Sequence, residues 1–488
     1  MNSRTTIAVK WSVITEFLAK IVSPIVNIVL ARILVPEAFG AVATITMVIS
    51  FAEIFTDAGF QKYIVQHEFE NEEYLDKSTA VAFWSNLVIS IIITSTLVIF
   101  RSKIALLVGS PGLGDAIGIA SLSVIMLAFS SIQTARFKRD LDFKSLFGCR
   151  IIGSLIPFVV TIPLALTFKN YWALVIGTLS VNCFSAFYLS VKSKWKIKFY
   201  YNFKHFKKMF SFTSWTLLES LVIWLTSNID IFIVGSILSD YYLGIYKTSM
   251  TTISSYMNIV SAAIIPVLFA SLSRTQSDEI EFKKTFLNIQ KYTAVILLPM
   301  SIGIFVYSDL VTQVLLGSQW MEASKFIGLW GLTSGLTIIV SHFCSEVFRS
   351  KGKPRISTLV QISHIICIIP VVYFCAKENP ELLFTARSIV RIELSVAALI
   401  ILCCCFKFKL LDILKNLIPP FASSVIMMAS AYLMLKLSNN FIWQFISVFI
   451  CIIIYFATLL LLFPKTRREL FSIPIVSKIL SKIRKKDR

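Results

Sequence analysis

Two arginines in the C-terminal half, Arg387 and Arg391, have the chemistry to meet an anion inside an apolar segment. They are four residues apart within 381–406, so one helix face carries both side chains. Guanidinium groups stay charged in proteins and fit phosphate oxygens bidentately. Two of them on one face repel each other unless an anion, water or a carboxylate meets them. We interpret the pair as an anionic-substrate site; the alternatives are pairing with a carboxylate elsewhere, or snorkelling of Arg387 to the membrane interface.

Three further basic residues in apolar segments are candidates for contacts with the same substrate: Lys20, Arg150 and Lys247. Each intramembrane charge marks either a substrate path or a structural pair. Lys20 follows Glu16 by four residues, the favourable order for an ion pair. Asp230 and Lys247 lie in consecutive apolar segments that a short turn joins, so an ion pair between them is the structural alternative.

Three carboxylates are candidates for coupling to a proton or sodium gradient. Glu53 and Asp57 share a helix face and repel unless a cation, a proton or a basic neighbour neutralises them. Glu219 falls near the middle of an apolar segment, where an ionised carboxylate is costly. The histidines His342 and His364 fit ordinary core residues better than a proton relay.

The elements that position these residues are membrane-spanning helices. Of 488 residues 56% are hydrophobic and 15% charged, with a mean hydropathy of +0.77, whereas soluble proteins are about 25% charged. Fourteen apolar segments have spanning length. They cover about 11–34, 39–60, 79–100, 114–135, 146–168, 171–191, 210–235, 245–270, 292–316, 326–348, 356–376, 381–406, 417–437 and 440–463.

The basic residues between these segments alternate in number. Thirty-five of the 47 Lys and Arg fall on the side of the N-terminus, six on the opposite side and six within or at the ends of segments. Cytoplasmic loops retain Lys and Arg. The pattern therefore predicts an even number of spans with both termini cytoplasmic.

The two halves of the chain resemble each other at one junction. Ile33 to Gly40 and Ile237 to Gly244 both begin Ile-Leu and end in Gly, at an offset of 204 residues. We expect two six-helix lobes with the substrate site between them, as in transporters built from parallel repeats. The expected parts are an N-terminal lobe at 1–208, a C-terminal lobe at 209–406, two added spans at 407–463 and a basic cytoplasmic tail at 464–488, which fits a helix on anionic lipid.

Several classes of chemistry have no support in the sequence. It contains no nucleotide-binding G-x-x-x-x-G-K-[ST] motif, and no loop is long enough for a soluble catalytic domain. Scattered cysteines and the run Cys403–Cys405 within an apolar segment predict neither disulfides nor a metal site. We expect a transporter without catalytic residues, and no nucleic-acid partner.

Several stretches carry a family resemblance. The stretch from Leu30 to Gly40, followed by Asp57-Ala58-Gly59-Phe60, resembles one branch of the MOP exporters. This branch consists of polysaccharide transporters of the Wzx type, which are lipopolysaccharide biosynthesis proteins. The segments 139–143, 230–246 and 316–320 fit the same family in order. The resemblance implies an all-α polytopic membrane protein of about fourteen helices: a MATE-like six-plus-six bundle around a cationic cavity, plus two C-terminal helices that form a lipid-facing groove.

The same resemblance implies a function. Such proteins move undecaprenyl-diphosphate-linked oligosaccharide repeat units across the bacterial plasma membrane for surface polysaccharides such as O-antigen and exopolysaccharide. Membrane lipids, a glycan polymerase and export machinery are the implied partners of a monomeric protein. The alternatives are a multidrug or toxin exporter, which would favour acidic cavity residues, a membrane-embedded glycan polymerase or ligase, and a scaffold that transports nothing.

Overall fold

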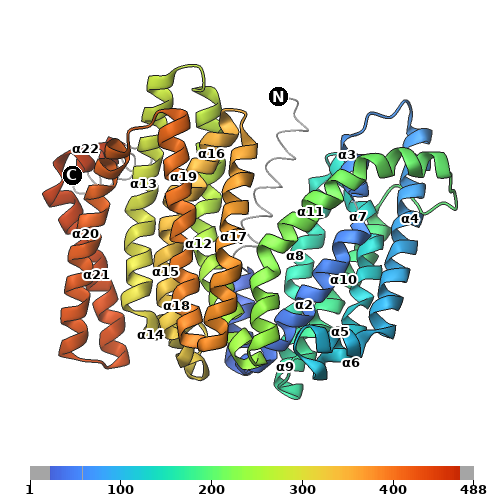
Figure 1. Cartoon of the computed structure of the whole chain (residues 1–488), viewed down its shortest axis with the longest axis horizontal. Coiled ribbons are helices and arrows are strands. Elements are labelled where there is room, and N and C mark those ends of the chain that lie inside the picture. Colours follow the sequence, from blue (N-terminus) through green and yellow to red (C-terminus); the bar gives the residue numbers. More distant parts are fainter. Residues whose placement is uncertain (1–21, 58, 473–488) are drawn as a thin grey trace, which may run out of the picture. The chain divides into compact units, whose positions relative to one another are not determined.

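The computed structural model describes residues 22–57 and 59–472, and its elements there are helices (Figure 1). The chain is helical at 22–33. The helices that follow are α2 (Pro36–Asp57), α3 (Phe60–Gln66), α4 (Glu72–Ile99), α5 (Arg101–Leu107), η1 (Pro111–Leu113), α6 (Gly114–Ala120), α7 (Leu122–Arg139), α8 (Phe143–Val159), α9 (Thr161–Phe168), α10 (Trp172–Lys192), α11 (Phe203–Ile237), α12 (Asp240–Arg274), α13 (Glu279–Val306), α14 (Ser308–Leu315), η2 (Ser318–Ala323), α15 (Ser324–Thr337), η3 (Ile338–His342), α16 (Phe343–Ser350), α17 (Pro354–Glu378), α18 (Pro380–Val390), α19 (Ile392–Phe406), α20 (Leu410–Leu437), α21 (Phe441–Leu462) and α22 (Pro464–Ser472).

Thirteen helices in the described residues are long and apolar enough to cross a membrane. They correspond to the second through fourteenth segments expected from the sequence. The first expected segment is represented by the shorter apolar helix Val22–Ile33, and its earlier part lies outside the described residues. The protein is therefore an all-helical, multi-pass membrane protein, as predicted.

Capping side chains fix where several helices begin at the polar ends of spans. Asn71 accepts a hydrogen bond of 2.7 Å from the amide of Tyr74 at the start of α4, where two glutamates occupy the first turn. Asp278 accepts bonds from the amides of Ile280 and Glu281 at the start of α13. Both caps satisfy amides that have no partner within the helix, and the acidic charges favour the helix N-terminus.

The helices form two compact units. The first comprises Met1–Thr248 and Val372–Leu383, and the second comprises Ser249–Val371 and Phe384–Arg488. The first unit extends past residue 208, where the repeat places the end of the N-terminal lobe, because α11 packs against α2, α3 and α4. The lobe boundaries drawn from the repeat remain a prediction. In the second unit α20 and α21 lie side by side (Figure 1).

Two glycines of the repeated junction meet inside the first unit. A methyl group on Gly40 would lie 1.8 Å from the carbonyl oxygen of Asp240, and one on Gly244 would lie 1.9 Å from that of Pro36. These four positions pair at the offset of 204 that relates the two halves in the sequence. The first turns of α2 and α12 therefore cross backbone to backbone, in a reciprocal contact that only glycine permits.

Candidate functional site

The predicted arginine pair lies in the second unit against one aromatic ring. Arg387 is near the end of α18, and Arg391 occupies the turn that separates α18 from α19. Their guanidinium carbons lie 5.0 Å and 3.8 Å from the centre of the Trp330 ring on α15. Both distances are within cation–π range. The structure thus brings together the two arginines that the sequence placed on one face, and Arg387 is only 7% exposed.

Hydrogen bonds hold this arrangement in place. The Nη1 of Arg391 donates to Ser334 Oγ at 2.9 Å, one helical turn beyond Trp330 on α15. The indole Nε1 of Trp330 donates to Ser254 Oγ of α12 at 3.4 Å. Helices α12 and α15 therefore fix the ring on which the arginines pack.

A histidine and a carboxylate lie next to the arginines. His364 Nδ1 of α17 is 3.1 Å from Glu393 Oε2 of α19, and Ser363 Oγ donates to Glu393 Oε1 at 3.0 Å. His364 interacts electrostatically with Arg387 as well as with Glu393. The site therefore combines two fixed positive charges with one partnered carboxylate. Sequence reasoning treated His364 as a core residue, and it is indeed buried with a partner.

His342 is accessible to solvent, although the surrounding protein atoms are dense enough to desolvate its ring. It is the last residue of the π-helical turn η3. Among the described residues from Phe326 to Phe348, it alone is exposed. Gln290 of α13 donates to the Ile339 carbonyl within this turn at 3.2 Å. His342 also interacts electrostatically with Arg391. Turns of this kind often mark functional sites. Because hydrophobic periodicity carries no signal for a π turn, the sequence did not reveal this exposure.

The other predicted basic residues have different settings. Lys247 is half-buried on α12 and interacts electrostatically with Asp230, which is 3% exposed and accepts a 2.9 Å bond from the Tyr246 hydroxyl. This is the structural alternative considered for Lys247. Arg150 is exposed on α8. Both belong to the first unit, whereas the arginine pair belongs to the second. Lys20 lies outside the described residues.

The predicted coupling carboxylates lie on two helices of the first unit. Glu53 is half-buried in α2. Asp57 ends α2 and Glu219 lies in α11, but their side chains are outside the described part of the structure. Within that described part, no group of three or more His, Cys, Asp or Glu is placed to hold a metal ion. Their role in coupling to a gradient remains a prediction.

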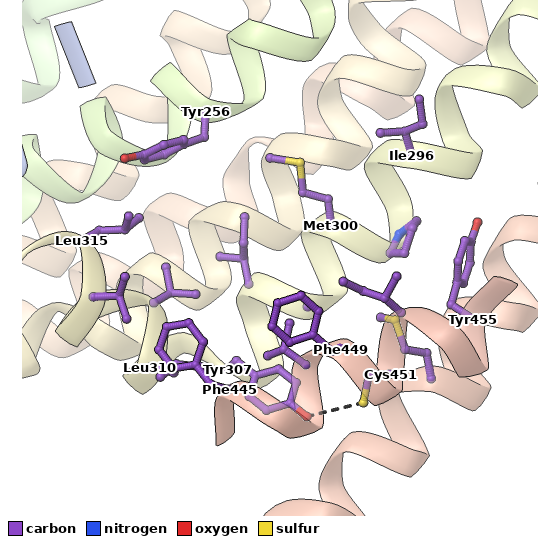
Figure 2. Close-up of a pocket in the computed structure, with 18 of the residues that line it drawn as sticks. Tyr256, Ile296, Met300, Tyr307, Leu310, Leu315, Phe445, Phe449, Cys451 and Tyr455 are labelled. Atoms are coloured by element: carbon purple, nitrogen blue, oxygen red, sulfur yellow. Dashed lines mark hydrogen bonds between the residues drawn. The ribbon is translucent and has the colours of Figure 1, made fainter. Parts of the chain in front are cut away.

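The second unit also contains an apolar cavity of about 590 Å³ between α12, α13, α14, α20 and α21 (Figure 2). Met300, Phe445 and Phe449 contribute to its walls. The Tyr307 hydroxyl donates to Ser447 Oγ at 2.9 Å, and the Tyr455 hydroxyl donates to the Val295 carbonyl at 2.8 Å. The polar ends of both tyrosines are thus bonded to protein, and their rings line the cavity. A hydrocarbon chain is the chemistry that fits such walls.

Curated relatives share most of the chain. An uncharacterised membrane protein in the cps region of Klebsiella pneumoniae is 23% identical over 385 residues, which cover 78% of each chain. The succinoglycan biosynthesis transport protein ExoT of Rhizobium meliloti is 24% identical and covers 70% of this chain and 69% of its own. The lipopolysaccharide biosynthesis protein WzxC of Escherichia coli is 21% identical, with 76% and 75% covered.

Solved structures share the fold. The lipid II flippase MurJ in an inward closed conformation aligns with a TM-score of 0.75 at 17% identity, over 92% of this chain and 98% of its own. An inward-facing multidrug resistance MATE family transporter of the MOP superfamily aligns with a TM-score of 0.57 at 14% identity, over 83% and 95%. The family described as "Polysaccharide biosynthesis protein" matches residues 29–325. That range exceeds half of the chain, so this protein belongs to the polysaccharide biosynthesis protein family, and its fold is similar to those of the MurJ flippase and the MATE transporter.

Proposed function

We propose that this transporter moves undecaprenyl-diphosphate-linked oligosaccharide repeat units from the inner to the outer leaflet of the bacterial plasma membrane. Similar proteins are described as taking part in succinoglycan biosynthesis transport, lipopolysaccharide biosynthesis and teichuronic acid biosynthesis, and each of these products contains a glycan. Both termini face the cytoplasm, and the lobes expose the substrate to each side in turn.

The observation that carries this proposal is the packing of Arg387 and Arg391 on Trp330 within a membrane span. Intramembrane charge is costly and is retained where it meets a substrate or an ion. A diphosphate offers oxygens to two guanidinium groups at once. The same charges oppose the cationic solutes of a drug exporter, so the arginine pair favours the glycan carrier lipid over that alternative.

The apolar cavity supports the lipid part of this substrate. It lies in the same compact unit as the arginines. Helix α13 lines the cavity and packs against both α15, which carries Trp330, and α20. Within this unit, the arginines can contact the anionic head of such a substrate and the apolar cavity can hold part of its polyprenyl tail. Coupling to a proton or sodium gradient through Glu53, Asp57 and Glu219 remains part of the proposal.

The test is glycan export in cells that carry Arg387→Ala or Arg391→Ala. We expect lipid-linked repeat units to accumulate and surface glycan to fall at least tenfold, while the amount of membrane-inserted protein is unchanged. Arg355→Ala is the matched control, because Arg355 is an exposed arginine at the start of α17 in the same unit. Normal export in both single variants and the double variant would overturn the assigned role of the pair.

A further inference from the structure

A lysine-rich and aromatic segment joins α10 to α11 on the face that the basic residues predict to be cytoplasmic. We call residues 192–210 the elbow. It contains no Asp or Glu. Its seven lysines are Lys192, Lys194, Lys196, Lys198, Lys204, Lys207 and Lys208, and its seven aromatic residues are Trp195, Phe199, Tyr200, Tyr201, Phe203, Phe206 and Phe210. Polar and aromatic side chains interleaved in this way are typical of a segment at the membrane–water interface.

The elbow is fixed against the membrane-spanning helix α4 of the same unit. Trp84 Nε1 donates to the Lys198 carbonyl at 3.0 Å, and the Ser85 hydroxyl lies 3.4 Å from the Tyr201 hydroxyl. The Lys198 ammonium lies 3.2 Å from Asp76 near the start of α4. These contacts extend along α4 from its polar end into its apolar part. The elbow therefore has a defined position where the span meets the interface.

A cavity of about 470 Å³ lies between α4 and the elbow. Trp84 and Val88 of α4 and Phe199, Tyr201 and Phe206 of the elbow are among the residues that line it. Phe199 is 89% exposed and Val88 is 52% exposed. The cavity thus opens beside apolar groups that are themselves uncovered, and its size is within the range of lipid and small-molecule sites.

The charges around the cavity are unbalanced. The acidic residues of α4 that approach the elbow have basic partners: Asp76 contacts Arg136 at 3.4 Å as well as Lys198, and Glu73 pairs with Lys77 at 2.6 Å. The other elbow lysines include Lys194, Lys204 and Lys207, which are exposed. The elbow, which forms one wall of the apolar cavity at the end of a span, therefore carries an excess of positive charge.

We propose that the elbow binds an anionic phospholipid of the adjacent leaflet, with an acyl chain in the cavity and the headgroup phosphate among the lysines. An apolar cavity alone fits any hydrocarbon chain, and exposed lysines alone attract any anion. Their combination beside a membrane span selects an amphiphile with a negative headgroup, and juxtamembrane lysine clusters attract anionic lipid. This site is separate from the arginine pair and does not depend on the proposed transport function.

The experiment measures binding of phosphatidylglycerol and phosphatidylcholine to the purified full-length protein by native mass spectrometry. One variant neutralises the exposed lysines: Lys194→Gln, Lys204→Gln and Lys207→Gln combined. A second, Val88→Trp, fills the cavity from its open side. The matched control combines Lys407→Gln, Lys409→Gln and Lys415→Gln, which are exposed lysines of the second unit on the same predicted face.

We expect the wild-type protein and the control to bind phosphatidylglycerol more tightly than phosphatidylcholine. The elbow triple variant should lose about tenfold or more of the phosphatidylglycerol affinity, since each lysine near a headgroup contributes to binding. Val88→Trp should weaken the binding of both lipids. Equal binding of the two lipids by the wild-type protein, equal losses in the elbow and control variants, or no effect of Val88→Trp would each overturn the proposal. Preferential binding of undecaprenyl phosphate that Val88→Trp abolishes would also overturn it, because the cavity would then hold the carrier lipid.

Discussion

The two compact units place polar groups in the membrane in different ways. In the first unit the buried groups are largely neutral: Asn86 Nδ2 donates to Ser131 Oγ at 2.9 Å, and Thr94 donates to the Ser121 carbonyl at 3.1 Å, at the junction of α6 and α7. In the second unit the junction of α18 and α19 carries the charged residue Arg391. Neutral pairs of this kind stabilise helix packing, whereas intramembrane charges mark a functional site. We therefore propose a structural role for these neutral pairs of the first unit and substrate contact for the arginine pair of the second, while Glu53, Asp57 and Glu219 of the first unit keep their proposed role in coupling.

The largest expected effect concerns the glycine crossing in the first unit. Gly40→Ala places a methyl group 1.8 Å from the Asp240 carbonyl oxygen, so α2 and α12 must move apart. We expect the free energy of unfolding to fall by about 3 kcal/mol or more, as for severe overpacking. Gly303→Ala is the control, because a methyl group there has no neighbour within 4 Å and alanine favours a helix. Thermal unfolding of the two purified variants at the same temperature would refute this account of the crossing.

Removal of the aromatic ring in the second unit should affect the substrate more than the fold. Trp330→Leu deletes the surface on which both arginines pack, at about 0.5–2 kcal/mol for each cation–π contact. We expect the affinity of Trp330→Leu for undecaprenyl diphosphate to be at least tenfold weaker than that of the wild-type protein. The affinity of Trp330→Phe should be intermediate between the two. Binding to purified protein checks this prediction. Identical affinities for the phenylalanine and leucine variants would show that the ring face has no role.

Removal of a neutral polar pair in the first unit should lower the stability of the protein without affecting transport. Asn86→Leu removes the bond to Ser131 and leaves a buried hydroxyl without this partner, at about 1–2 kcal/mol. We expect a lower thermal midpoint and normal glycan export at a temperature where the variant remains folded. Loss of export by a fully folded Asn86→Leu protein would contradict the division of roles between the units.

The smallest expected effect comes from the carboxylate beside the arginines. Glu393→Gln keeps the side-chain size but removes a negative charge that competes with an anionic substrate. We expect affinity for undecaprenyl diphosphate to rise by about fivefold, which corresponds to about 1 kcal/mol at the effective dielectric constant of such sites. Release should slow, so export should fall modestly. A weaker affinity in this variant would indicate that Glu393 instead holds the site together.

The sequence predicted the features that depend on local pattern. Hydropathy located the spans, the four-residue spacing placed Arg387 and Arg391 together, and the offset of 204 identified the two junctions that meet at Gly40 and Gly244. Each of these features can be read from the order of residues, because each depends on hydropathy, on helical periodicity or on the spacing of the repeat.

Other features depend on contacts between distant segments. Trp330 is 57 residues before Arg387, and a tryptophan in an apolar run ordinarily indicates a core residue. The partnership of His364 with Glu393 depends on how α17 and α19 pack. The exposure of His342 follows from the π turn, which shifts side-chain directions without any change in hydrophobic pattern.

The most direct test of the central claim is the affinity of the purified protein for undecaprenyl diphosphate, with uncharged undecaprenol as the comparison lipid. We predict that the combined variant Arg387→Ala and Arg391→Ala loses at least a hundredfold in affinity for the diphosphate and keeps its affinity for undecaprenol, since two charge-assisted contacts of about 1.5–3 kcal/mol each are removed. Equal affinity of the variant and wild-type proteins for undecaprenyl diphosphate would contradict the claim that the arginine pair binds the substrate.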